Sequence, residues 1–72
     1  MKRVSVFGMG YVGCVTAACA SRDGHQVIGV DIDRDKVATL QAGSSPVAEP
    51  GLDELIREQV AAGRLEATTN IE

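Results

Sequence analysis

Aromatic residues and an excess of positive charge are both missing from this sequence. It has one phenylalanine, one tyrosine and no tryptophan, and 10 acidic residues outnumber 7 basic ones, for a net charge of −3. Proteins that bind nucleic acids need clustered positive charge for the phosphates, often with aromatic side chains for the bases. We therefore expect no nucleic-acid partner.

Long apolar runs are also absent. A membrane-spanning helix needs ~20 consecutive apolar residues, and no stretch of the chain approaches that length. The basic start, Lys2 and Arg3, is followed by an apolar stretch at residues 4–7 that glycines soon interrupt. Such a stretch is too short for the core of a secretory leader. The pattern predicts no membrane segment and favours the cytoplasm.

The two cysteines, Cys14 and Cys19, form no recognisable metal or redox motif. Five positions along a helix place them about 140° apart, at ~100° per residue, so within one helix they can neither share a metal ion nor form a disulfide. No CxxC pair or histidine cluster accompanies them. We interpret both as small side chains in a helix that packs on a sheet, and we expect no metal site.

The most informative feature that is present is a glycine pattern behind an apolar stretch. Gly8, Gly10 and Gly13 follow residues 4–7 in the order G-x-G-x-x-G, and Asp31 closes a second apolar run 18 residues later. A strand, glycine turn, helix, strand and acid in this order are typical of a dinucleotide-binding unit. Gly8 allows the tight turn, Gly10 lets backbone contact a pyrophosphate, and Gly13 lets the helix lie close to the sheet. The alternative is a glycine turn that serves only helix packing.

Hydrophobic periodicity and glycine or proline breaks divide the chain into six elements. The near-continuous apolar run at the start is typical of a parallel strand buried on both faces. Asp33 is suited to cap the second helix, and Gly29 marks a close backbone approach inside the second strand. We expect strands at 2–7, 26–31 and 65–69, and helices at 11–23, 34–42 and 52–62.

This β-α-β-α-α-β order predicts an α/β fold. Right-handed crossovers place the strands side by side in the order 3-2-1, which is the first half of a Rossmann-type doubly wound parallel sheet. The strands that would pair with the free side of the first strand are not in this sequence, and an exposed apolar edge favours pairing. We therefore expect residues 1–72 to be a partial dinucleotide-binding domain, or a chain that relies on a partner.

Asp31 is the strongest single candidate for cofactor binding. At the carboxyl end of the second strand its carboxylate can accept hydrogen bonds from the adenosine ribose, and its charge repels a 2′-phosphate, which favours NAD over NADP. Arg34 argues the other way, because a nearby arginine can bind that phosphate. The first helix has no Ser, Thr, Asp or Asn cap, so a pyrophosphate is a suitable acceptor for its first amides. Lys36 is equally well explained as an exposed helix lysine.

Three other polar residues have ordinary interpretations. His25 is a turn residue with no carboxylate or nucleophile at a suggestive spacing, and Glu49 is a loop acid between two prolines. Tyr11 is better explained by packing or cofactor contact than by acid chemistry. No nucleophile is arranged with a base, so we expect no catalytic residue in this sequence.

Four segments of the sequence carry a family resemblance: FGMGYVG at 7–13, GHQVIGVD at 24–31, SPVAEPGL at 45–52 and AGRL at 62–65, followed by two threonines. Together they resemble the amino-terminal part of the UDP-glucose/GDP-mannose dehydrogenase family. The glycine turn and the SPVAEPGL loop are far more specific in combination than the glycines alone. The likeness covers the whole chain and is slightly closer to the GDP-mannose members than to the UDP-glucose members.

The resemblance implies an activity for the complete protein. Family members oxidise the sugar 6-hydroxyl of a nucleotide sugar to a carboxylate in two NAD-dependent steps, through a cysteine-bound thioester, and they are usually dimers or larger. Neither Cys14 nor Cys19 matches that cysteine, and the sugar-binding domain is absent, so the 72 residues alone are expected to be inactive. The positions that match the family's NAD site are Gly8, Gly10, Tyr11, Val12, Gly13, Asp31 and Lys36.

Two rival interpretations remain open. One is a non-catalytic module that binds NAD or a related adenine nucleotide for sensing or assembly. The other is a structural α/β fragment that pairs through its open edge and has no affinity for nucleotides. A catalytic cysteine motif downstream in the same reading frame would favour the enzyme over the first rival, and NAD binding would exclude the second.

Overall fold

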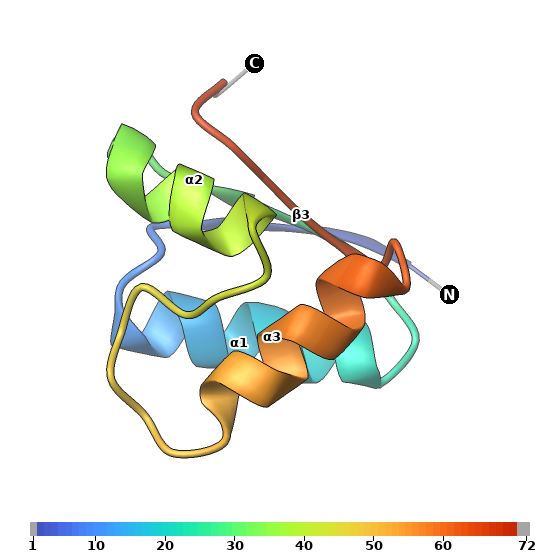
Figure 1. Ribbon diagram of the computed structural model, residues 1–72. Coiled ribbons are helices and arrows are strands. Elements are labelled where there is room, and N and C mark those ends of the chain that lie inside the picture. The colour runs from blue at the N-terminus through green and yellow to red at the C-terminus, as the bar shows by residue number, and fades with distance from the viewer. Residues whose placement is uncertain (1, 71–72) are drawn as a thin grey trace.

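The computed structural model describes residues 2–70. Their element order is β-α-β-α-α-β, as the sequence predicts, and every boundary lies within one residue of the predicted one (Figure 1). Differences of this size are normal at element ends. The strands are β1 (Arg3–Phe7), β2 (Gln26–Val30) and β3 (Leu65–Thr68), and the helices are α1 (Tyr11–Arg22), α2 (Arg34–Gln41) and α3 (Leu52–Ala61).

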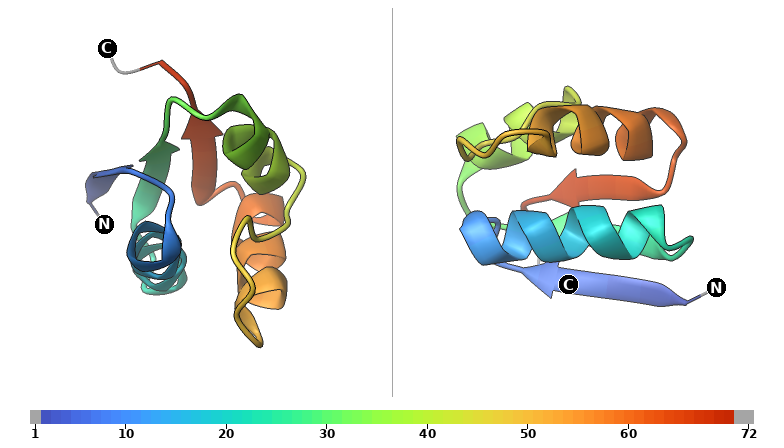
Figure 2. Two further views of the ribbon diagram at one scale, coloured as in Figure 1. Left: turned by 90° about the vertical axis from the view of Figure 1, so that its left-hand side faces the viewer. Right: turned by 90° about the horizontal axis from the view of Figure 1, so that it is seen from below.

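The three strands form one parallel sheet with β2 in the centre. Its order β1-β2-β3 is the predicted 3-2-1 order counted from the other edge, and the arrows in Figure 2 point the same way. Phe7 lies beside Val30, and Val30 lies beside Thr68. The carboxyl ends of all three strands therefore meet at one edge, where ligands of open α/β sheets bind.

The helices leave one face of the sheet uncovered. α1 packs on β1 and β2, while α2 and α3 pack on β3, and α1 and α3 lie side by side. Val4, Val27 and Leu65 belong to the side that meets the helices, whereas Arg3 and Glu66 on the opposite side are exposed. The expectation that the first strand is buried on both faces is therefore wrong for this chain. Both right-handed crossovers run in the same direction across the sheet, so all the helices lie on the same side.

A single apolar core fills the space between the helices and the covered face of the sheet. Met9, Leu40 and Ile56 are the largest side chains buried in it, together with small residues of α1. Cys14, Ala17 and Ala18 have no exposed surface, which lets the helix approach the strands closely. α3 is amphipathic, as its helical spacing predicts: Leu52 and Ile56 are buried, and its charged residues are exposed.

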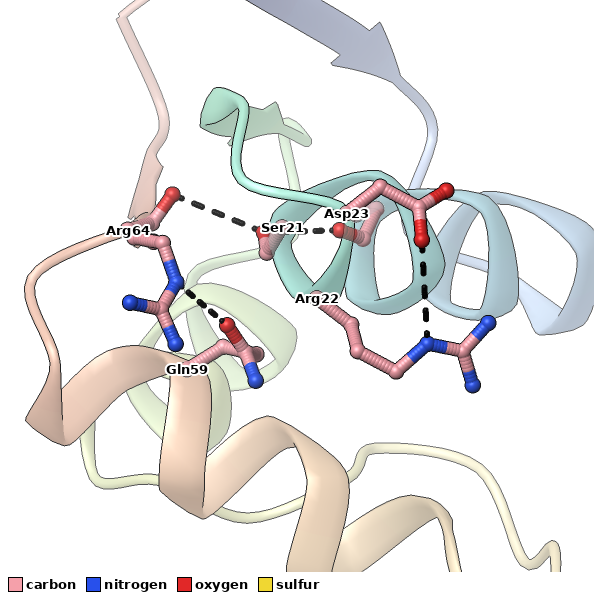
Figure 3. Close-up of polar contacts among 6 residues, drawn as sticks. Ser21, Arg22, Asp23, Gln59 and Arg64 are labelled. Carbon is pink, nitrogen blue, oxygen red and sulfur yellow. Dashed lines mark hydrogen bonds and ion pairs between the residues drawn. The ribbon is translucent and has the colours of Figure 1, made fainter. Parts of the chain in front are cut away.

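The end of α1 farthest from the glycine turn is held by polar side chains (Figure 3). Ser21 is fully buried, and its Oγ donates to the carbonyl of Ala17 at 2.8 Å and to that of Arg64 at 3.5 Å. Nε of Arg64 donates to Oε1 of buried Gln59 at 2.8 Å. These contacts tie α1 to the start of β3 and to α3. The exposed pair between Arg22 and its neighbour, at 3.9 Å, contributes little.

Each helix ends at a glycine in the left-handed region. After α1, Gly24 has φ +98°, its N–H donates to Ser21, and the N–H of His25 donates to Ala20. This pair of hydrogen bonds is the Schellman motif, and the same pair closes α2 and α3. The helix starts differ. Oδ1 of Asp33 caps α2 by accepting from the amides of Asp35 and Lys36, whereas none of the described side chains caps α1.

We expect the cap on α2 to be measurable. Asp33→Ala should lower the free energy of unfolding by about 1 kcal/mol, because two helix amides lose their acceptor. Asp35→Ala is the matched control: it removes the same charge from the same turn but only a dipole interaction, for a loss of about 0.3 kcal/mol. Urea unfolding followed by circular dichroism measures both, and equal losses would contradict the capping assignment.

Candidate functional site

The glycine turn between β1 and α1 has a different requirement at each glycine. Gly8 has φ +90°, and its N–H donates to the carbonyl of Val30 at 2.7 Å, which joins the turn to the end of β2. A Cβ on Gly13 would lie 1.8 Å from the carbonyl oxygen of Gly8. The fold therefore needs glycine at both positions. Gly10 has an ordinary φ of −77°, and a Cβ there would meet nothing within 4 Å. The protein's own packing does not explain the glycine at this position.

The first turn of α1 presents unpaired amides at the same place. No side chain caps the helix and no acidic residue lies in its first turn. Within residues 2–70, the amides of Tyr11, Val12 and Gly13 have no hydrogen-bond acceptor. Free amides and the positive end of the helix dipole make a site for an anion such as a phosphate. The open space over Gly10 gives such an anion access to the backbone.

Apolar side chains surround this opening. In the described part of the chain, four large apolar side chains are more than half exposed: Phe7, Tyr11, Val12 and Ile32. Phe7 ends β1, Ile32 follows β2 by two positions, and the other two begin α1, so all four lie near the carboxyl edge of the sheet. Exposed apolar residues around a few polar groups are typical of a ligand site.

Asp31 points its carboxylate toward the glycine turn. Oδ2 accepts from the amide of Met9 at 2.7 Å, and Oδ1 accepts from the amide of Asp33 at 2.9 Å. The hydrogen bond from Asp33 lowers the pKa of this carboxyl most, followed by the one from Met9, and the charge of Lys36 acts in the same direction. Asp31 is therefore an ionised acceptor, and each oxygen keeps capacity for a further donor such as a ribose hydroxyl.

Lys36 is brought to the same place by the start of α2. Its positive charge acts on the Asp31 carboxyl and contributes to lowering the pKa of that group. Asp33 positions it by capping the helix one turn earlier. The predicted candidates on three separate segments thus converge on one edge of the sheet.

The remaining candidates from the sequence lie outside this arrangement. Cys14 is fully buried, its Sγ donates to the carbonyl of Met9 at 3.2 Å, and burial raises the pKa of its thiol. Cys19 is half-buried in a groove of about 260 Å³ that Glu49 also lines. Nδ1 of His25 accepts from the amide of Lys2 at 3.2 Å, which is a structural role in a turn. Both cysteines agree with the packing interpretation.

Two further findings concern metals and membranes. Across residues 2–70, no group of three His, Cys, Asp or Glu side chains is arranged to hold a metal ion. None of the helices in this part of the chain combines the length and the apolar character that crossing a membrane requires.

Met9 is the residue that sequence reasoning missed. It lies between two glycines of the turn, yet it is fully buried, and a Cβ on Gly29 would be 2.5 Å from its Sδ. The prediction that Gly29 marks a close approach is correct in kind, but the approaching group is a side chain and not a backbone. The sequence contains a large apolar residue inside the glycine pattern and a glycine in the next strand, but neither feature by itself shows that the two meet.

Comparisons with known proteins agree with this geometry. The model of the NAD-binding domain of the UDP-glucose/GDP-mannose dehydrogenase family matches residues 2–72. A GDP-mannose 6-dehydrogenase of Azotobacter vinelandii is 54% identical over 69 residues, which are 96% of this chain and 16% of that protein. A UDP-glucose 6-dehydrogenase of Haloferax volcanii is 52% identical over 67 residues, 93% of this chain and 15% of that protein.

Solved structures show the same likeness. A GDP-mannose dehydrogenase from Pseudomonas aeruginosa, solved as a ternary complex, superposes with a TM-score of 0.92 at 48% identity and covers 94% of this chain. A UDP-glucose dehydrogenase from Pyrobaculum islandicum also gives 0.92, at 38% identity and 97% coverage. The chain spans 16% of each of these two proteins.

Gly10 and Gly13 should respond differently to the same substitution. Gly10→Ala should cost less than about 1 kcal/mol of stability, since the new methyl group enters open space at a helix N-cap, and it should weaken nucleotide binding at least about tenfold by occupying the anion site. Gly13→Ala should cost about 3 kcal/mol, because the methyl group collides with backbone. Urea unfolding and calorimetric titration separate the effects, and a Gly10→Ala chain that binds normally would exclude the anion site.

The lowered pKa of Asp31 predicts a direction for stability against pH. The hydrogen-bonded carboxylate stabilises the fold fully above the ordinary value of 3.8 and loses its contribution as pH falls through the lower folded-state pKa. The difference in unfolding free energy between the wild-type chain and Asp31→Asn should be constant well above pH 3.8 and should shrink as the pH falls below 3.8. Urea unfolding at a series of pH values measures this, and a difference that grows on acidification would show that the sign is wrong.

Proposed function

Because the chain belongs to the UDP-glucose/GDP-mannose dehydrogenase family and matches its NAD-binding domain, we propose that it holds the adenosine and pyrophosphate part of NAD in a nucleotide-sugar 6-dehydrogenase. The cofactor predicted from the sequence, NAD, is confirmed by this membership. The observation that carries the proposal is the convergence of unpaired amides on α1 with the ionised carboxylate of Asp31. The two groups suit a diphosphate and its neighbouring ribose.

Each proposed contact uses a feature of the site. Gly8 and Gly13 shape the turn, and Gly10 leaves its backbone open to the pyrophosphate. The amides of Tyr11 and Val12 bind the phosphate oxygens at the positive end of the helix dipole. These contacts are made by the backbone to the phosphates, so they fix the position of the cofactor along the sheet edge. They do not read the identity of the nucleobase.

Asp31 and Lys36 are proposed to hold the adenosine ribose. The carboxylate accepts from the ribose hydroxyls, and the lysine beside it supplies a donor. A fixed negative charge at this position repels the 2′-phosphate of NADP. Arg34, exposed at the start of α2, is a nearby group that could oppose this preference, and we propose that Asp31 outweighs it because both its oxygens are held in place.

The proposed reaction of the whole protein is the oxidation of a sugar 6-hydroxyl to a carboxylate. When bound, NAD accepts hydride, and a change from alcohol to acid requires two NAD molecules. GDP-mannose is the favoured substrate, with UDP-glucose next, because the GDP-mannose 6-dehydrogenase of Azotobacter vinelandii is 54% identical to this chain and the UDP-glucose 6-dehydrogenase of Haloferax volcanii is 52% identical. The 72 residues supply no nucleophile for this chemistry, so their contribution is to bind and orient the cofactor.

We also propose how these residues fit into the complete protein. The other half of a doubly wound domain would place its strands beside the free edge of β1 and its helices on the uncovered face of the sheet. That face has a groove of about 430 Å³ lined by Arg3, Ser5 and Glu66 among others. Catalytic and sugar-binding domains, and the contacts of a dimer or larger oligomer, belong to other parts of the protein. The cytoplasm stays the proposed compartment, as expected from the sequence.

Calorimetric titration with NAD tests the cofactor site. Asp31→Ala should weaken binding roughly tenfold to a hundredfold, since hydrogen bonds to a charged group are lost. Glu66→Ala is the matched control: it removes one negative charge from the uncovered face of the sheet and should leave the affinity unchanged. NADP should bind the wild-type chain more weakly than NAD, and the Asp31→Ala chain should lose most of that preference.

Two results would contradict the proposal. One is a folded wild-type chain with no saturable affinity for NAD, which would favour a purely structural role. The other is an unchanged affinity in Asp31→Ala. A chain that binds NAD, in a protein whose complete reading frame has no catalytic cysteine, would instead favour the non-catalytic nucleotide-binding module over the dehydrogenase.

A further inference from the structure

Met9 occupies an unusual position for a core residue. It is the only residue with a side chain between Gly8 and Gly10, in the turn that faces the proposed cofactor. Its side chain is nevertheless fully buried and is among the largest in the core. Met9 therefore connects the site directly to the packing of the core. Its backbone lies in the turn that faces the ligand, and its whole side chain is buried.

The side chain of Met9 lies in a notch that two glycines create. On β2, a Cβ at Gly29 would be 2.5 Å from Sδ and 3.2 Å from Cε of Met9. On α1, a Cβ at Gly13 would be 3.3 Å from the same Cε. Each glycine leaves the space that the thioether fills. The notch therefore determines where the turn sits relative to both β2 and α1.

The backbone of Met9 makes two further contacts at this point. Its N–H donates to Oδ2 of Asp31 at 2.7 Å, and its carbonyl accepts from Sγ of the buried Cys14 at 3.2 Å. The side chain, the N–H and the carbonyl of one residue thus join the turn to α1 and to the end of β2 with Asp31. The amide that holds the Asp31 carboxylate is attached to a side chain that the core holds in place.

We propose that Met9 is a positioning residue of the NAD site, whose side chain in the notch of Gly13 and Gly29 holds its amide against Asp31. This proposal rests on the proposed function for its ligand, but the contact that it explains exists without one. Glycines on both sides of Met9 would otherwise leave the turn with a wide range of backbone conformations. The side chain removes that freedom before the cofactor arrives, so that binding has less ordering to do.

An NMR titration of the Asp31 carboxyl carbon, without ligand, tests the positioning. In Met9→Ala the amide is no longer held in place, and the pKa of Asp31 should rise toward its ordinary value of 3.8. Met9→Leu, which keeps the volume of the side chain, should retain the wild-type pKa. Ile56→Ala is the control, because it truncates an equally buried core residue on α3 and leaves the turn intact. The pKa of Asp31 should stay at the wild-type value in this control.

Binding of NAD gives a second measurement on the same chains. Met9→Ala should bind roughly tenfold more weakly at equal folded fraction, as expected when a charged hydrogen bond is lost, while Met9→Leu and Ile56→Ala should bind like the wild type. If Met9→Ala does not fold, Met9→Val replaces it, since it leaves a smaller cavity and also loses the reach to Gly29.

The proposal is overturned if a folded Met9→Ala or Met9→Val chain keeps the wild-type pKa of Asp31. It is equally overturned if Ile56→Ala shifts that pKa as far, because the effect would then be general loosening of the core. Failure of the wild-type chain to bind NAD is a separate result that contradicts the proposed function, since the carboxyl titration is measured without ligand.

Discussion

The contact between Gly13 and the carbonyl of Gly8 is the constraint on which the site depends. A methyl group at Gly13 would lie 1.8 Å from that oxygen, so the first turn of α1 lies directly against the end of β1. The N–H of Gly8 also donates a hydrogen bond to the carbonyl of Val30 in β2. The helix, the turn and two strands are therefore joined within a few residues. The free amides of α1 are consequently directed out over the carboxyl edge of the sheet.

The two ends of α1 serve different purposes. At the far end, Ser21, Gly24 and the Arg64–Gln59 pair satisfy the backbone and anchor the helix. At the near end the amides have no partner within residues 2–70, a cost to stability that a bound anion removes. Packing holds the near end instead, because Cys14 is fully buried and Gly13 lies against the carbonyl of Gly8. Stability and binding are thereby separated along one helix.

Charge at the site is balanced without a strong ion pair. The carboxylate of Asp31 is stabilised chiefly by two backbone amides, and Lys36 adds a weaker favourable field. Amides in a turn that is packed on the core have fixed positions, whereas a lysine side chain is flexible. The carboxylate therefore keeps one orientation, which is what selective recognition of a ribose requires.

Much of this protein follows from local patterns that can be read along the chain. Glycine spacing, helical periodicity and the caps predict all six elements, the parallel order of the strands and the convergence of Asp31 with the glycine turn, because each depends on backbone conformation and on chain connectivity over short distances. The proximity of Lys36 to the carboxylate followed only from resemblance, since a lysine on an exposed helix has no distinguishing pattern. The tertiary structure alone decided that β1 is buried on one face only and that the Met9 side chain lies between Gly13 and Gly29. Both depend on which surfaces meet when separate segments pack, and no spacing within one segment contains that information.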